Sequence, residues 1–293
     1  MVLPSIISKQ SYAAWRMKIS SMLLQKESGS EFYWILDACA HPKLPGILWE
    51  LEQNPEARPL YMNTYKEEVS AAGPYILPAN DNNAVSRWFF EQSNEKPVGC
   101  LIEIAAGFYP VAFEHLQQQL ECYPGNEHLT LFRWYDPRIL YGLSTYSEQD
   151  HIRARFMGPV LYFHAWEPGR CSDIVYGIGR DLGIRSEAPE YHDEKLFDHI
   201  WDEVSIHTII GTLGSETGMK LRSLPLPEAY KLVEQVQQIL LRYNYFDRRS
   251  LAYGASITAK LGLDIWERAD VREAFEQRPP NAPIDEVIES LDI

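Results

Sequence analysis

The chain has few of the residues that build the most recognisable chemical sites. It contains four cysteines in 293 residues, and no two of them form a Cys-x-x-Cys pair. That spacing argues against a zinc knuckle or a thioredoxin-type redox site. It is typical of buried free thiols in a reducing compartment. The four positions are Cys39, Cys100, Cys122 and Cys171.

Basic residues are also scarce. Lysine and arginine total 27 against 41 aspartates and glutamates, which gives a formal net charge of −14 and a sequence pI of about 5.0. Nucleic-acid binding needs clustered positive charge that displaces counterions from phosphates, so we expect no nucleic-acid partner. The acidic balance is compatible with a basic protein partner.

Long apolar runs are missing as well. No stretch approaches the roughly 20 apolar residues that span a bilayer. The first ten residues lack the basic start, the apolar core and the small-residue cleavage site of a signal peptide. These absences predict a cytoplasmic protein without a membrane partner.

Motifs for cofactors, metals and nucleophiles are weak or absent. The chain has no phosphate-binding Gly-x-x-x-x-Gly-Lys-Ser/Thr loop and no Gly-x-Ser-x-Gly elbow. The run Gly177–Gly183 fits a dinucleotide fingerprint poorly and predicts a turn-rich loop. His192, His199 and His207 are seven and eight residues apart, whereas a metal pair on one helix is normally three or four apart. We therefore predict no catalytic residue, cofactor or metal.

The acidic segment 187–203, which contains His192 and His199, has two open interpretations. It is a solvated face, or it is an electrostatic docking strip for a basic partner.

What the chain does have is enough apolar material for a core. Hydrophobic residues make up 45% and aromatic residues 12% of it. Strand-like and helix-like patterns alternate up to residue 166, which is typical of an α/β domain. From residue 225 onward the pattern is helical, with one apolar stripe formed by Leu226, Tyr230, Val233, Val236, Leu240 and Tyr243.

The predicted fold is an α/β N-terminal lobe, with a mixed sheet and flanking helices, followed by a mainly α-helical C-terminal lobe. The lobes are 1–166 and 225–293, with 167–224 as a connecting or inserted, partly acidic segment. Strands are predicted at 32–39, 67–77, 98–105, 129–135 and 160–166, the last near a sheet edge. Helices are predicted at 11–26, 45–51, 83–92, 110–120 and 137–146.

The most informative stretch is 129–143, where an aromatic, apolar run meets a helix. Asp136 lies where a helix N-cap would, and Pro137 takes the first helical position. Arg133 and Arg138 flank this turn. One interpretation is a helix cap, worth about 1 kcal/mol. The other is a polar recognition point on a partner surface. The residues alone leave both open.

Several segments taken in order resemble a known family. They are Phe32–Ala38, Ala72–Leu77, Gly99–Glu103, Leu131–Leu140 and Phe156–Pro159, which cover about residues 30 to 165. In order and spacing they resemble the domain of unknown function 4123 family. Its members are effector chaperones, or adaptors, of bacterial type VI secretion.

The resemblance implies a function without catalysis. Such a protein binds a cognate toxic effector in the cytoplasm and helps to load it onto the VgrG spike protein. The resemblance also implies a shared α/β lobe and a variable C-terminal lobe, and it leaves open which lobe binds which partner. The matched positions offered for protein binding, or for holding the binding surface, are Asp37, Arg133, Trp134, Tyr135, Asp136 and Arg138.

Two other classes stay open. An immunity protein that neutralises a toxin is often acidic and compact, and it would protect cells from that toxin. An enzyme with an unrecognised site of arginine and carboxylate would need a cleft with convergent polar groups and a perturbed titratable residue.

Overall fold

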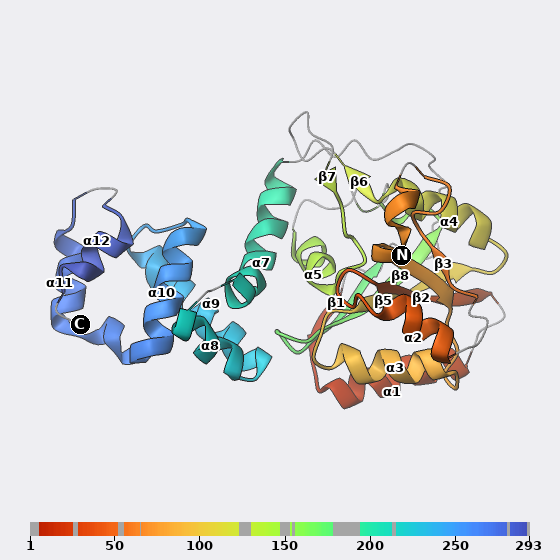
Figure 1. The fold of residues 1–293 in the computed structure, drawn as a ribbon, viewed down its shortest axis with the longest axis horizontal. Helices are drawn as coiled ribbons and strands as arrows, with labels where there is room; N and C mark the ends of the chain where they lie inside the picture. The colour runs from red at the N-terminus through yellow and green to blue at the C-terminus, as the bar shows by residue number, and fades with distance from the viewer. Residues whose placement is uncertain are drawn as a thin grey trace. The chain divides into compact units, whose positions relative to one another are not determined.

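The structure, a computed structural model, falls into two compact units, Met1–Glu203 and Val204–Ile293 (Figure 1). The boundary lies inside the segment 167–224 and within a continuous helix, α7 (Glu194–Thr212). The described residues are 6–25, 29–51, 56–64, 66–122, 130–146, 153, 156–177, 194–212, 215–279 and 282–291.

Unit 1 is built on a seven-stranded sheet. The described strands of this sheet are β1 (Ile6–Lys9), β2 (Ser30–Asp37), β3 (Arg58–Pro59), β4 (Pro74–Pro78), β5 (Gly99–Ala105), β8 (Val160–Glu167) and β9 (Ser172–Gly177). A separate two-stranded ribbon is formed by β6 (Glu121–Cys122) and β7 (Thr130–Leu131). The sheet order is β1-β9-β8-β5-β2-β4-β3, and β6 pairs with β7 in the ribbon. Every pairing among these strands is antiparallel.

Helices cover both faces of this sheet. The helices of unit 1 before α7 are α1 (Tyr12–Leu24), α2 (Leu44–Leu51), α3 (Ala84–Ser93), α4 (Tyr109–Gln118) and α5 (Pro137–Thr145), with a 3-10 helix η1 (Glu67–Ala72). On one face, Trp34 of β2 stacks on Phe89 of α3 with ring centroids 4.1 Å apart, beside Trp15 of α1. α1 and α3 run together along that side (Figure 1).

The opposite face carries the neighbouring residues of the same strands, because side chains alternate along a strand. There Tyr33 of β2 stacks on Tyr109 of α4, at 4.6 Å between ring centroids. Phe163 of β8 packs against Trp134, just before α5, at 5.5 Å. Asp37 lies four residues after Tyr33 on β2, so its side chain is on the same face of the sheet. The candidate site lies here.

Unit 2 has a helical core of its own. Apart from the end of α7, its elements are α8 (Ser215–Ser223), α9 (Leu226–Arg242), α10 (Arg248–Leu261), the 3-10 helix η2 (Leu263–Glu267), α11 (Ala269–Gln277) and α12 (Ile284–Glu289). The middle of the predicted α9 stripe is buried, with Tyr230, Val233, Val236 and Leu240 at most 1% exposed. Leu226 and Tyr243, at the two ends of the stripe, are partly buried. The predicted fold class, a sheet with helices followed by a mostly helical part, is confirmed.

Three predicted strands differ from the structure. Of 67–77, the first part is η1 and only Pro74–Pro78 is a strand, because Gly73 and Pro74 separate them. Of 129–135, only Thr130–Leu131 is a described strand; residues 132–135 are not in a strand, and their aromatic side chains are buried all the same. The strand predicted at 160–166 exists, but β9 and β1 extend the sheet beyond it, so it is not at an edge.

Among the described cysteines, Cys39 also departs from expectation. It is exposed, whereas Cys100 and Cys122 are buried and Cys171 is intermediate; all four are free thiols.

None of the described helices combines the length and apolar character that crossing a membrane requires.

Candidate functional site

The turn before α5 has the predicted cap. Asp136 has an extended backbone, with φ −74° and ψ 122°, and its carboxylate accepts a hydrogen bond from the Arg138 backbone N–H at 3.0 Å. Pro137 occupies the first turn of the helix, where its missing N–H costs nothing. The Asp136 N–H donates to the Arg133 carbonyl at 2.9 Å, which closes the turn. Asp136 is therefore the N-cap of α5.

The same carboxylate also pairs with arginine side chains. Arg138 Nε donates to Asp136 Oδ1 at 2.8 Å, and its Nη2 donates to Oδ2, so the contact is bidentate. Arg133 Nη2 lies 3.9 Å from Asp136 Oδ2. Bidentate pairing fixes both the position and the orientation of a guanidinium. Cap and ion pair thus share one buried aspartate, which is 2% exposed.

Arg133 extends this network to a distant part of the chain. Its Nη2 donates to Oδ2 of Asp37, which ends β2 and is 1% exposed. The other oxygen of Asp37 accepts the Cys39 backbone N–H at 2.9 Å. The result is a row of alternating charges, Arg138, Asp136, Arg133 and Asp37, that ties the start of α5 to the end of β2.

The pKa values of the two aspartates are shifted in opposite directions. For Asp37, burial raises the pKa of the carboxyl above its ordinary value, and the Arg133 charge opposes that rise without cancelling it. For Asp136, burial also disfavours the charge, but Arg138 next to it holds the pKa below its ordinary value. Two nitrogens of Arg138 hold the Asp136 carboxylate, whereas one nitrogen of Arg133 holds that of Asp37, so the Asp136 anion is stabilised more than the Asp37 anion.

The two aromatic candidates are in the core. Trp134 is 0% and Tyr135 1% exposed, and their rings meet edge to face at 5.3 Å between centroids. Burial, followed by the Asp37 charge, raises the pKa of Tyr135, so its phenol stays neutral. Of the six predicted residues, Arg133 has the most exposed side chain, at 28%, followed by Arg138 at 13%.

A pocket begins where this network ends. It has a volume of about 320 Å³ and is lined by Tyr61, Thr64, Lys66, Glu114, Gln117, Gln118, Leu120 and Glu121. Lys66 Nζ lies 2.5 Å from Glu121 Oε1 at its wall. Tyr61 in the pocket wall lies close enough to Asp37 and Arg133 for both charges to act on the pKa of its phenol.

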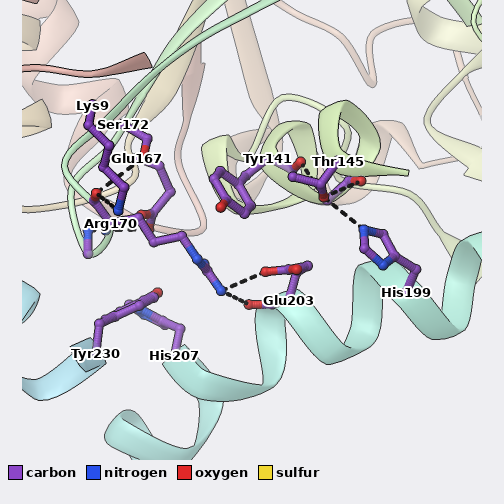
Figure 2. Close-up of polar contacts among 12 residues, drawn as sticks. Lys9, Tyr141, Thr145, Glu167, Arg170, Ser172, His199, Glu203, His207 and Tyr230 are labelled. Atoms are coloured by element: carbon purple, nitrogen blue, oxygen red, sulfur yellow. Dashed lines mark hydrogen bonds and ion pairs between the residues drawn. The ribbon is translucent and has the colours of Figure 1, made fainter. Parts of the chain in front are cut away.

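A second polar cluster, which the sequence analysis missed, lies on the hairpin between β8 and β9 (Figure 2). Glu167 is 0% exposed and accepts backbone N–H groups of Gly169 and Arg170. Arg170 Nη2 reaches α7, where it contacts Glu203 Oε2 at 2.7 Å and the Glu203 carbonyl at 3.1 Å. The signal in the sequence was Pro168-Gly169, a dipeptide that marks a turn.

Arg138 links the two clusters electrostatically. Burial raises the pKa of Glu167, while the charges of Arg170 and, more weakly, Arg138 oppose that rise. The Arg170 guanidinium also lies over the Tyr141 ring of α5, 4.5 Å from its centroid. Both clusters therefore hold α5, one at its first turn and one along its length.

The histidines make ordinary contacts within each unit (Figure 2). His199 Nε2 is 2.7 Å from the Thr145 hydroxyl in unit 1, and His207 Nδ1 is 3.0 Å from the Tyr230 hydroxyl in unit 2. His192 lies outside the described residues, as does Gly177–Gly183 after its first residue. Within the described ranges, no group of three or more His, Cys, Asp or Glu side chains could hold a metal ion.

Comparison with known proteins gives one match. Residues 32–154 match a family model described as domain of unknown function (DUF4123). The match supports this domain family for that part of the chain, from β2 to beyond α5. All six predicted residues lie in the DUF4123 segment, whereas Glu167 and Arg170 lie after it. No curated protein and no solved structure matches the chain.

Proposed function

We propose that the protein is an effector chaperone, or adaptor, of type VI secretion. It binds a cognate toxic effector in the cytoplasm, helps to load it onto the VgrG spike and catalyses no reaction. The observation that carries this proposal is the DUF4123 match over 32–154, because the segments that resemble the chaperone family lie almost entirely within that range.

The geometry of the charged row supports a binding role. Asp37 and Asp136 are both buried, and each is held by an arginine and a backbone N–H. A general base needs an accessible carboxylate within reach of a substrate proton, and neither aspartate offers one. In this proposal the row of charges fixes the start of α5 to the end of β2. A partner then contacts the exposed parts of Arg133 and Arg138.

The DUF4123 segment also presents apolar side chains to solvent. Trp49 on α2 is 64% exposed and Val69 in η1 is 52% exposed. Tryptophan and arginine are the residue types that most often dominate binding energy at protein interfaces. Trp49 is therefore our first candidate for a partner contact outside the charged row.

The test is affinity capture of the full chain, tagged and expressed in its native bacterium, followed by mass spectrometry. We expect co-purification of one large toxin-like protein, with or without a spike protein. Deleting the gene should stop export of that toxin. A folded protein that captures neither would overturn the proposal.

Two variants separate binding from folding. Trp49→Ala changes an exposed side chain, so it should weaken capture while leaving the unfolding midpoint unchanged. Arg87→Ala, on an exposed arginine of α3 in the same segment, is the matched control and should change neither.

The net charge of −14 keeps an immunity protein as the second candidate. An immunity protein would protect cells that express the captured toxin while leaving its export unchanged. That result would replace the chaperone role with the immunity role.

A further inference from the structure

Unit 2 contains a pocket far from the DUF4123 segment in the sequence. Its volume is about 390 Å³, within the range of small-ligand sites. One side is the turn between α9 and α10, with Asn244, Tyr245 and Asp247; the other is the chain around the start of α12, with Asp285. Arg249 and Arg278 complete the polar lining.

Both carboxylates of this pocket already make contacts within the chain. Asp247 caps α10: its two carboxylate oxygens take the N–H and the hydroxyl of Ser250, at 2.8 and 2.6 Å. Asp285 Oδ2 takes Arg249 Nη2 at 2.7 Å. Asp285 Oδ1 has no hydrogen-bond partner among the described residues, but it is buried, so a ligand in the pocket does not reach it. Asp247 thus serves as the cap of α10 and Asp285 as the partner of Arg249, so both carboxylates have a structural role within the chain.

The donors, in contrast, are available. The Arg249 side chain is 81% exposed, and in the described part of the chain its single ion-pair partner is Asp285, at one nitrogen. A guanidinium has five N–H donors, so most of its capacity faces water. The amide of Asn244 is exposed too, with no hydrogen bond to another described residue.

Two further residues favour a bound anion beside an apolar group. Arg278 donates to the carbonyls of Phe275 and Tyr243 and lies over the Tyr245 ring, so its positive charge is fixed at the pocket. Phe246, between two lining residues, is 74% exposed, the largest exposure among the large hydrophobic side chains described. Its ring suits an apolar neighbour of the anion.

We propose that this pocket binds a carboxylate of a peptide, seated on Arg249 and Asn244, with an adjacent apolar side chain packed on Phe246. The inference does not depend on the chaperone role, because it rests on unit 2 alone. The proposed ligand class for the C-terminal helices is a peptide that carries a carboxylate, even though the chain as a whole is acidic.

Four short peptides test the proposal on the full-length protein, by NMR titration of the labelled chain. They are acetyl-Leu-Glu-Leu-amide, its Gln and Lys counterparts, and acetyl-Leu-Gln-Leu with a free C-terminal carboxylate. We expect one or both carboxylate peptides to bind roughly tenfold more tightly than the Gln amide, the gain of a charge-assisted hydrogen bond. The stronger of the two identifies a side-chain or a terminal carboxylate as the source.

Variants confirm the site. Arg249→Ala should abolish the roughly tenfold preference. Asn244→Gly should weaken it while permitting the positive φ of 57° at that position. Arg268→Ala removes another exposed, ion-paired arginine of unit 2 that does not line the pocket, so it should change nothing. Equal binding of all four peptides, tightest binding of the Lys peptide, or a preference that survives Arg249→Ala would overturn the proposal.

Discussion

Arg133 and Asp37 are 96 residues apart in the sequence, yet the guanidinium of the first binds the buried carboxylate of the second. The contact joins the turn before α5 to the end of β2. A buried carboxylate without a neighbouring cation destabilises the fold, so removing Arg133 should cost more than the contact itself contributes.

Replacing Arg133 with methionine should therefore destabilise the protein by about 3 to 5 kcal/mol, because Asp37 would stay buried without its partner. Urea unfolding at neutral pH measures the loss. Adding Asp37→Asn to this variant should recover part of it, since the uncompensated charge is then gone. Arg87→Met, on an exposed arginine, is the control and should cost less than about 0.5 kcal/mol. A loss for Arg133→Met as small as this would show that the tie is not structural.

The raised pKa of Glu167 should make part of the protein's stability depend on pH. Its pKa in the folded protein is raised above the ordinary 4.5, so its contribution is complete below that pH and is lost as the pH rises through the folded value. Glu167→Gln cannot titrate. The free energy of unfolding of the wild type, minus that of Glu167→Gln, should fall as the pH rises from about 4 to about 7.

Asp136→Asn is the companion with the opposite sign. The pKa of Asp136 is lowered below 3.8, so its contribution is present above that pH and is lost as the pH falls through the folded value. Here the difference between wild type and variant should shrink on acidification. Urea titrations carried from about pH 7 down to about pH 2 measure both differences. Slopes of the same sign would contradict the assignment.

Removing the Arg170 guanidinium should loosen the first half of α7. Arg170 contacts the side chain and the carbonyl of Glu203, and both contacts are lost in Arg170→Gln. Amide hydrogen exchange in 194–203 should accelerate by at least about tenfold, with β8 and β9 less affected. Lys195→Gln, on an exposed lysine of the same helix, should leave exchange unchanged. Unaltered exchange in Arg170→Gln would mean that packing alone holds the helix.

Gly99 permits the close approach of β5 to β2. Its φ is +144°, and a Cβ there would lie 1.9 Å from the carbonyl oxygen of Ile35. Gly99→Ala should cost on the order of 3 kcal/mol or more, from strain and a clash with backbone. Gly107 has a φ of +80° with open space around it, so Gly107→Ala should cost only about 1 to 2 kcal/mol. Thermal unfolding of the pair isolates the clash, and equal costs would exclude it.

Local features of the candidate site were predictable from the sequence. Asp136 followed by Pro137 specifies a cap and a first turn within three residues, and the structure has both. The apolar stripe of α9 is likewise a property of one helix. Such features depend on near neighbours, which the sequence shows directly.

Contacts across the chain were not predictable in the same way. The resemblance selected Asp37 and Arg133, but no spacing rule pairs residues that far apart. Trp134 and Tyr135 belong to a buried turn, because aromatic residues fill a core from turns as well as from strands. Glu167 and Arg170 were missed because β9 and β1, which make their hairpin part of the sheet, are short and weakly patterned.

The position of β1 has a consequence for how the chain is made. Among the described strands, β1 pairs with β9 alone, from Ile6 opposite Val175 to Lys9 opposite Ser172. β1 can therefore join the sheet only after β9 has been synthesised, a delay on the order of ten to thirty seconds at ordinary rates of synthesis. Until then β1 has no strand to pair with, and its unpaired backbone groups are open to mispairing with another copy of the nascent chain.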